Sequence, residues 1–279
     1  MQSKIMKHLR IIFLGDIVGA AGVAILQKHI GRLREQYRAD AIIVNGENSA
    51  AGGRGITPAL MRLFKSLGIS LVTSGNHIWQ KPDIIPYITQ HTDLLRPANF
   101  PAGTPGTGVT TFLCKGIEIG VINVQGRVFM RELLSCPFRA IESALTYLHH
   151  KTPIIFIDVH AETTSEKMAI AYMFDGRVSG IVGTHTHVQT ADERILPGGT
   201  AYITDLGMAG SLNSMIGMKK EPIIQNFLTQ MPVRFVVDTS LPVCMTGVCI
   251  EVDTQSGKAT SIEPIRVIDD QVQIDTQEL

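Results

Sequence analysis

The sequence is short of several features that would each have pointed to one class of protein. It has four cysteines in 279 residues, and none of them form a CxxC pair. Scattered thiols argue against a disulfide-stapled secreted domain and against a structural zinc site. Lysine plus arginine equals aspartate plus glutamate at 25 each. With no excess of positive charge, we expect no surface for duplex nucleic acid or for an anionic membrane.

The sequence also predicts no membrane-spanning segment, because no stretch approaches the ~20 apolar residues that cross a bilayer. Residues 1–26 resemble a signal peptide in outline, with a basic start and then an apolar run. Asp16 lies inside that run, where a charge is costly in a membrane, and Gly15 and Gly19 interrupt it. We therefore expect no signal peptide, no membrane contact and a cytoplasmic protein.

A nucleotide cofactor is not expected either. The stretch "GDIVGAAG" follows an apolar run, but Gly15, Gly19 and Gly22 do not give the GxGxxG spacing. The acidic residue expected ~20 positions further on would be Asp40, which precedes the next apolar run instead of ending it. No GxxxxGK[ST] motif occurs in the chain.

The main feature of the sequence is a set of five short apolar runs, each with polar residues at its end. Each run is rich in isoleucine and valine and does not alternate with polar residues, which is typical of strands covered on both faces of a sheet. Hydrophobic residues make up 44% of the chain, enough for a sizeable core. The runs with their polar ends are "LRIIFLGD", "DAIIVNGEN", "ISLVTSGNH", "TPIIFIDVH" and "SGIVGTHTH".

Helical patterns separate the runs, so we predict an α/β fold with a parallel β-α-β N-terminal half. The expected helices cover residues 20–37, 57–67, 139–149 and 164–173. A hairpin is expected to turn at Lys115–Gly116. Beyond residue 198 the apolar stretches, "VRFVVDT" among them, predict a second and more antiparallel sheet. We expect one domain over residues 1–279, with a small cap about residues 80–110.

In open α/β sheets, ligands bind beyond the carboxyl ends of the strands, which is where the polar residues of all five runs stand. Carboxylates, amide oxygens and imidazoles without a thiolate suit manganese, iron or zinc. Seven such groups are too many for one tetrahedral ion and suit two ions that share a bridging carboxylate. The candidate ligands are Asp16, Glu47, Asn48, Asn76, His160, His185 and His187.

Two ions can clamp a phosphate, and metal-bound water can have its pKa lowered toward ~7, so that hydroxide attacks at neutral pH. His77 follows Asn76 directly and would be placed to protonate the leaving oxygen as a general acid. His185 and His187 are two apart, so in extended backbone both would point to the same side.

Other roles remain open for several of these residues. Asn48 could instead close a turn or cap a helix, and Asn76 could be a left-handed turn residue. Asp158 could orient a ligand or pair with a basic side chain, and we expect no direct metal contact from it. Glu162 and Asp205 also stand near strand ends and receive no role.

The motifs "GD", "GEN", "GNH", "H" and "GTHTH", in this order at strand ends, resemble those of the calcineurin-like metallophosphoesterases. Two departures are that no histidine stands two after Asp16, and that Glu47 replaces the usual bridging aspartate. Both are shared with the narrower group of YmdB-like bacterial phosphodiesterases, which the chain resembles from about residue 8 to 270. The stretches that carry the resemblance include "VNGENSAAGGRGIT", "SGNHIW", "LLRPANFPAGTPGTG" and "DVHAETTSEKMA".

The resemblance implies a two-sheet α/β sandwich of the metallophosphoesterase type that hydrolyses cyclic nucleotides, such as 2′,3′-cAMP, or other phosphodiesters. It implies iron or manganese, with zinc as an alternative, and a cytoplasmic homo-oligomer. Glu47 would bridge the ions, and His77 would donate the proton. Asp16, Asn48 and His187 would hold one ion, and Asn76, His160 and His185 the other.

Two further functions stay open beside this one. The chain could be a nucleotide-sensing regulatory module whose hydrolysis is vestigial, or a metal-dependent hydrolase of other esters. The second is the weaker alternative, because two clamped ions match phosphate oxygens.

Overall fold

Two mixed six-stranded sheets form the centre of the computed structural model, which describes residues 7–275. The first sheet has the order β12-β11-β10-β1-β2-β3, and the second has the order β4-β5-β6-β7-β9-β8. The neighbours β1, β2 and β3 are parallel, as are β5, β6, β7 and β9. The strands are β1 (His8–Ile17), β2 (Ala41–Asn45), β3 (Leu71–Thr73), β4 (Val109–Cys114), β5 (Ile117–Gln125), β6 (Ile155–His160), β7 (Gly180–Thr184), β8 (Arg194–Ile195), β9 (Ala201–Ile203), β10 (Met208–Ser211), β11 (Val243–Asp253) and β12 (Ala259–Asp269).

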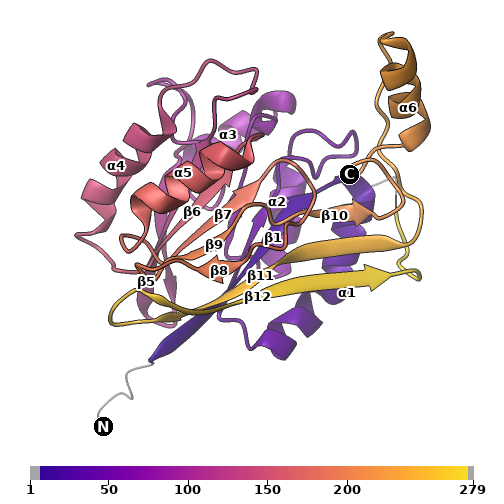
Figure 1. Cartoon of the computed structure of the whole chain (residues 1–279). Helices are drawn as coiled ribbons and strands as arrows, with labels where there is room; N and C mark the ends of the chain where they lie inside the picture. The colour runs from indigo at the N-terminus through magenta and orange to yellow at the C-terminus, as the bar shows by residue number, and fades with distance from the viewer. Residues whose placement is uncertain (1–6, 276–279) are drawn as a thin grey trace.

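Helices cover the outer faces of the two sheets, which pack against each other. Side chains of α1, α2 and α3 belong to the cluster that packs on the first sheet, and those of α4 and α5 to the cluster on the second. Figure 1 shows α4 and α5 on the opposite side of the molecule from α1. The result is an α/β sandwich with two sheets, as the resemblance to the metallophosphoesterases implies. The helices are α1 (Gly19–Tyr37), α2 (Pro58–Ser66), the short 3₁₀ helix η1 (Ile78–Gln80), α3 (Ile84–Gln90), α4 (Pro137–Leu148), α5 (Thr164–Phe174) and α6 (Lys220–Thr229).

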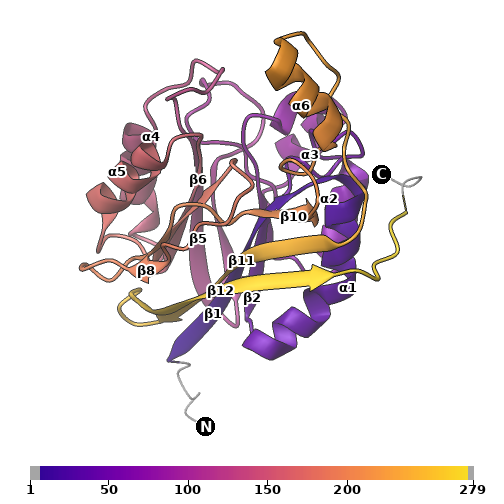
Figure 2. The same ribbon diagram turned by 45° about the vertical axis from the view of Figure 1, so that its right-hand side comes forward.

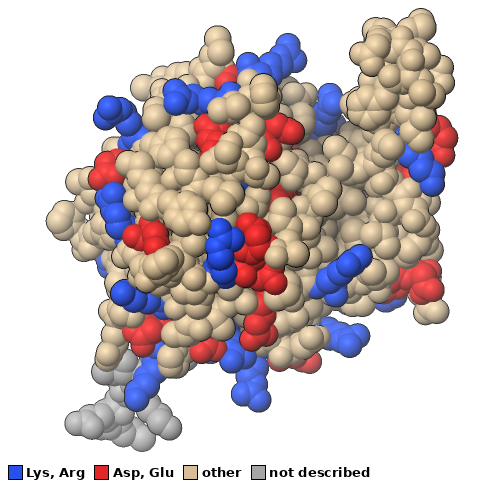
Figure 3. Space-filling model, in the orientation of Figure 1, with Lys and Arg blue, Asp and Glu red and all other residues tan. Residues whose placement is uncertain are grey.

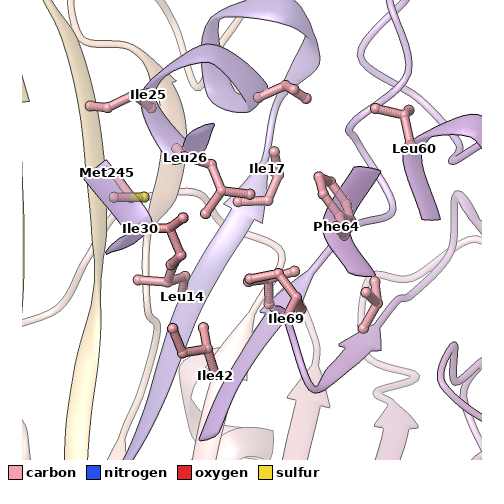
Figure 4. Packing of buried hydrophobic residues seen from close by; sticks show 14 of the residues in the cluster. Leu14, Ile17, Ile25, Leu26, Ile30, Ile42, Leu60, Phe64, Ile69 and Met245 are labelled. Atoms are coloured by element: carbon pink, nitrogen blue, oxygen red, sulfur yellow. The ribbon is translucent and has the colours of Figure 1, made fainter. Parts of the chain in front are cut away.

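The side chains of β1 show why the apolar runs do not alternate with polar residues. Ile12 and Leu14 pack toward α1 and α2, in the cluster of Figure 4. Ile11 and Phe13 point the other way, into the core between the sheets, where the Phe13 and Phe156 rings lie 5.0 Å apart. Successive residues of a strand face opposite sides. Because both sides of this sheet are covered, the four successive residues Ile11–Leu14 are all apolar and buried.

The C-terminal strands correct one part of the predicted topology. β11 and β12 are antiparallel as expected, but they do not form a sheet of their own. β11 pairs with β1 over His8–Leu14 and so extends the first sheet, while β9 pairs with β7 in the second. Among the described residues, "VRFVVDT" at 233–239 is irregular except for an isolated bridge from Val237 to Met218. Strands β10 and β11, which are distant in the sequence, pair with β1. No local sequence pattern indicates this pairing.

The predicted hairpin is present, and Lys115 and Gly116 both have positive φ, at 50° and 82°, as its tight turn requires. Residues 80–110, where a small cap is expected, hold the end of η1, then α3, an irregular stretch and the start of β4. The element that projects from the body is α6, in both Figure 1 and Figure 2, and the surface over it in Figure 3 is almost free of charged side chains. Residues 1–6 of the signal-peptide-like pattern lie outside the described part. Within that part, no helix has both the length and the apolar character to cross a membrane.

Candidate metal centre

The polar ends of the five runs meet between the two sheets. The backbone N–H of His185, just after β7, donates to Asp16 Oδ2 in β1 over 3.1 Å. His160 Nε2, at the end of β6, lies 2.9 Å from Glu47 Oε1, two residues after β2. These contacts join the first sheet to the second at the carboxyl ends of their parallel strands, which is the edge predicted to carry ligands.

The first group of side chains, which we call the His160 cluster, consists of Glu47, Asn76, His160 and His185. Around His160 Nε2 stand Glu47 Oε1 at 2.9 Å, Asn76 Oδ1 at 2.9 Å and His185 Nδ1 at 3.1 Å. One ring N–H cannot satisfy three acceptors with good geometry. Ligand atoms of Glu47, His160 and His185 lie within 4.8 Å of one another and could hold a metal ion. So many converging lone pairs are what a cation requires.

Buried hydrogen bonds behind the ring set the orientation of His160. Thr184 Oγ1 donates to Asp158 Oδ1 over 2.8 Å and is 3.0 Å from His160 Nδ1. With its own hydrogen given to Asp158, the Thr184 oxygen accepts from Nδ1–H, which leaves Nε2 with a free lone pair toward the cluster. Asp158 therefore orients the His160 ring through Thr184, and its two carboxylate oxygens accept from the hydroxyls of Thr73 and Thr184 rather than from a basic side chain. Burial raises the pKa of Asp158 to about 6.

Gly75 explains the "SGNH" sequence before Asn76. A Cβ at Gly75 would lie 2.0 Å from His160 Cδ2 and 2.2 Å from His160 Nε2. The backbone that carries Asn76 thus passes directly against the imidazole, and only a residue without a side chain allows both to occupy these positions.

The remaining predicted ligands are Asp16, Asn48 and His187, which we call the Asp16 cluster. Asp16 Oδ1 is 3.6 Å from His187 Nε2, and His187 Nδ1 is 2.8 Å from the carbonyl oxygen of Ile216. Asn48 Nδ2 donates to the Gly53 carbonyl over 2.8 Å, so this amide does help to close a turn. Its Oδ1, however, is buried without a hydrogen-bond partner, and so is Asp16 Oδ1. Buried acceptors of this kind cost free energy unless something positive pairs with them.

The charges of the site are arranged to receive positive charge. Burial raises the pKa of the Asp16 carboxyl, but the nearby His187 and His160 outweigh it and hold the pKa well below its usual range. The pKa of Glu47 is lowered in the same way against burial, chiefly by His160. Burial lowers the pKa of His187, but Asp16 overcomes this and raises it to about 9. Burial and His160 lower the pKa of His185 to about 3, so its ring is neutral and free to act as a ligand.

His77 stands beside the clusters without contributing its ring to either. Its backbone N–H donates to Glu47 Oε2 over 2.9 Å, and its ring Nδ1 is buried with no hydrogen-bond partner. Burial lowers the pKa of His77, Glu47 opposes this, and Arg54 lowers the pKa further. The ring is therefore unprotonated near neutral pH until negative charge arrives next to it.

The backbone of "GTHTH" corrects one part of the sequence prediction. His185 and His187 do not lie in extended backbone, because their φ angles are +99° and +63° and β7 ends at Thr184. Left-handed backbone is costly for a histidine and persists only where its surroundings impose it. Asn76 shows the opposite, since its φ is not positive and the left-handed alternative for it is wrong.

A buried ion pair holds this loop. Lys167 Nζ is 2.7 Å from Asp205 Oδ2, and the two side chains are 1% and 0% exposed. Asp205 Oδ2 also accepts from the backbone N–H and the hydroxyl of Thr186, between the two histidines. Its Oδ1 accepts from the Gly207 N–H, and the Gly207 carbonyl accepts from the Asp16 N–H. The pair thus fixes both sides of the Asp16 cluster.

Three supporting residues are not among the sequence candidates. Lys167 could have been noticed, because it is a charged residue at a buried position of α5. Nothing in the sequence singles out Thr184. Asn45 Oδ1 accepts from the Glu47 N–H over 3.1 Å, and its position two before Glu47 in "VNGEN" could have pointed to it. Glu162, left without a role by the sequence, lies with Oε2 3.1 Å from His185 Nε2.

Comparison with known proteins agrees with this arrangement. A family model described as "YmdB-like protein" matches residues 12–265. The chain belongs to the YmdB-like family. A curated relative from Bacillus subtilis (strain 168), named 2′,3′-cyclic-nucleotide 2′-phosphodiesterase, is 46% identical over 94% of this chain and 98% of its own.

Solved structures similar to this YmdB-like chain have the same fold. A structure described as a novel phosphatase from Mycoplasma pneumoniae has a TM-score of 0.89 at 37% identity and covers 95% of both chains. A hypothetical protein from Thermus thermophilus has a TM-score of 0.85 at 36% identity, over 94% of this chain and all of the other. The fold is the two-sheet α/β sandwich of the metallophosphoesterase type.

Proposed function

We propose that this chain is a dinuclear metal-dependent phosphodiesterase that hydrolyses 2′,3′-cyclic nucleotides. The observation that carries the proposal is the convergence of Glu47, Asn76 and His185 on His160 Nε2. The buried oxygens of Asp16 and Asn48 that lack a partner support it. The relative named a 2′,3′-cyclic-nucleotide 2′-phosphodiesterase supports the choice of substrate.

The two clusters divide the proposed ligands between two ions. Asn76, His160 and His185 would hold one ion, Asp16, Asn48 and His187 the other, and Glu47 would bridge them. This oxygen and nitrogen set without a thiolate suits iron or manganese, and zinc is the alternative. When bound, such ions neutralise phosphate charge and make a hydroxide available at neutral pH.

The chain's own residues would supply orientation and a proton. In hydrolysis to a 3′-nucleotide, a water oxygen bonds to phosphorus, the bond from phosphorus to O2′ breaks, and O2′ takes up a proton. We assign that proton to His77, whose ring lies beside Glu47 but has no partner for Nδ1. The low pKa of His77 in the free protein is consistent with this role because a phosphate dianion or diester next to the ring favours its protonated form.

The test is hydrolysis of 2′,3′-cAMP and bis-p-nitrophenyl phosphate with Mn²⁺ and with EDTA. We expect turnover with Mn²⁺ and none with EDTA, and equal turnover under both conditions would contradict the proposal. His77→Ala should lower kcat by ~10²–10⁴-fold and keep its metal, because its backbone N–H still reaches Glu47. Glu47→Gln should lose both activity and metal. If His77→Ala also lost its metal, the proton-donor assignment would be wrong.

A further inference from the structure

A basic groove lies next to the metal centre, at the base of α6. It has a volume of about 690 Å³, within the range of pockets that hold a small ligand. Its lining includes Arg54, Lys219 and Arg234, the exposed ring of Phe235, and no carboxylate. Within residues 7–275, none of these three cations has a carboxylate oxygen within 4.0 Å. In a chain with no net charge, three unpaired cations around one groove are a local excess.

Hydrogen bonds connect the walls of this groove to the Asp16 cluster. The segment with Arg54 is joined through Gly53, whose carbonyl accepts from Asn48 Nδ2 over 2.8 Å. The segment with Lys219 is joined through Ile216, whose carbonyl oxygen is 2.8 Å from His187 Nδ1.

The segment that carries Arg234 and Phe235 is held against the same wall. Lys219 N–H donates to the Val236 carbonyl over 2.8 Å, and Asp238 N–H donates to the Gly217 carbonyl over 2.9 Å. The groove and the metal centre are therefore neighbours within one bonded framework, and a ligand longer than one nucleotide could occupy both.

The chemistry of a 2′,3′-cyclic phosphate limits how such a ligand can continue. Both O2′ and O3′ are bonded to the phosphorus at the metal centre, so the chain can extend only from O5′ of the same ribose. The next group along is a phosphate, followed by another nucleoside. Unpaired cations with an aromatic ring are what binds a single-stranded sugar–phosphate chain, whereas 2′,3′-cAMP has no second phosphate to meet them.

We propose that this groove binds the 5′-phosphate and preceding nucleotide of an RNA 3′ end that carries a 2′,3′-cyclic phosphate. The inference rests on the function proposed above and extends its substrate from mononucleotides to short single-stranded RNA. Arg54, Lys219 and Arg234 would contact phosphate, and Phe235 would stack on a base.

The test compares kcat/KM for 2′,3′-cAMP, for its 5′-phosphorylated form and for a di-adenylate that ends in 2′,3′-cyclic phosphate. One added charge-assisted contact predicts a preference of about tenfold or more for the two longer substrates. Lys219→Gln and Arg234→Gln should each reduce that ratio. Lys220→Gln, the neighbouring exposed lysine that does not line the groove, should leave the ratio as it is.

A binding measurement separates this inference from the proposed activity. A fluorescent oligoadenylate with a linear 3′-phosphate is titrated against the EDTA-treated full chain by anisotropy, with inorganic phosphate as competitor. We expect salt-dependent binding whose slope falls by ~0.7 for each phosphate contact removed, as for single strands. Equal kcat/KM for all three substrates, or equal oligoadenylate binding by wild type and Arg234→Gln, would overturn the inference. If the oligoadenylate binds but 2′,3′-cAMP is not hydrolysed, the proposed function is wrong, while the groove is still a site for single-stranded RNA.

Discussion

The two clusters of the metal centre are built from different kinds of structure. In the His160 cluster, His160 is part of β6, fully buried, and oriented by Thr184 at the end of β7. In the Asp16 cluster, His187 lies in a left-handed loop and Asn48 in a turn. His160 is thus positioned by its own strand and by β7, whereas His187 depends on the buried Lys167–Asp205 pair and on the Ile216 carbonyl. Asp16 and His185 cross this division, since Asp16 lies in β1 and His185 shares the left-handed loop with His187. A side chain at the end of a strand, such as His160, can be anticipated from sequence spacing, but the placement of a loop side chain such as His187 depends on contacts that spacing does not show.

The largest effect is expected from Lys167→Met, which removes the cation of the buried pair beside the Asp16 cluster. It leaves the Asp205 carboxylate buried without its cation, and breaking a buried pair in this way costs ~3–5 kcal/mol. We expect a large loss of stability in urea unfolding and weaker metal binding. The double variant Lys167→Met/Asp205→Asn should recover part of the stability, because no unpaired charge remains. If it recovered none, the charge would not be what holds the loop.

The Gly75→Ala substitution disturbs the His160 cluster instead. Its methyl group would overlap the His160 ring, so Asn76, His160 or both must move. Displacement of a site by about 1 Å can cost ~10²-fold in rate, and we expect at least that loss of kcat. Gly31→Ala is the matched control, since a Cβ at this position of α1 has open space around it. Normal activity in Gly75→Ala would show that the close approach is not needed.

Thr184→Val should have a smaller effect on the same cluster. The isosteric side chain keeps the packing but removes the hydroxyl that fixes the His160 tautomer. Loss of such an orienting partner typically lowers metal affinity by ~10–100-fold. Competition with a chelator measures this affinity. Thr184→Ser keeps the hydroxyl and should retain most of it, while equal losses in both variants would point to packing.

The smallest effect concerns pH and the Asp16 cluster. Asp16 raises the pKa of His187 from 6.5 to about 9 in the metal-free protein. This pair therefore contributes stability that is fully present below pH 6.5 and is lost as pH rises through about 9. We expect the Tm of EDTA-treated protein to fall between pH 6.5 and 9.5 by more in wild type than in His187→Gln. An equal fall in both proteins would assign the pH dependence elsewhere.

Much of the fold could be predicted because burial on both faces leaves a plain pattern. The five apolar runs are strands, and their polar ends do meet, since carboxyl ends of parallel strands share an edge. The partner of an open strand edge has no such pattern. Thus β11 could be recognised as a strand, but not as the neighbour of β1. "VRFVVDT" has a strand-like composition and yet is irregular, because its backbone bonds to the segment around Lys219 instead of a sheet.

In the candidate site, too, some features could be predicted from the sequence and others could not. Its donor types and order along the chain could be taken from the sequence, as could the place of His77 beside Asn76. The left-handed backbone of His185 and His187, the Lys167–Asp205 pair and the hydroxyl of Thr184 could not. Each of these depends on a partner at least 19 residues away in the chain.

The proposed function requires that the two clusters, which share the Glu47 carboxylate, hold two ions. Metal analysis of the purified chain after reconstitution with Mn²⁺ and desalting, beside Glu47→Gln treated identically, tests this most directly. We expect about two ions per wild-type chain and fewer in Glu47→Gln. A wild-type chain that keeps at most one ion, or a Glu47→Gln variant with the full wild-type content, would contradict it.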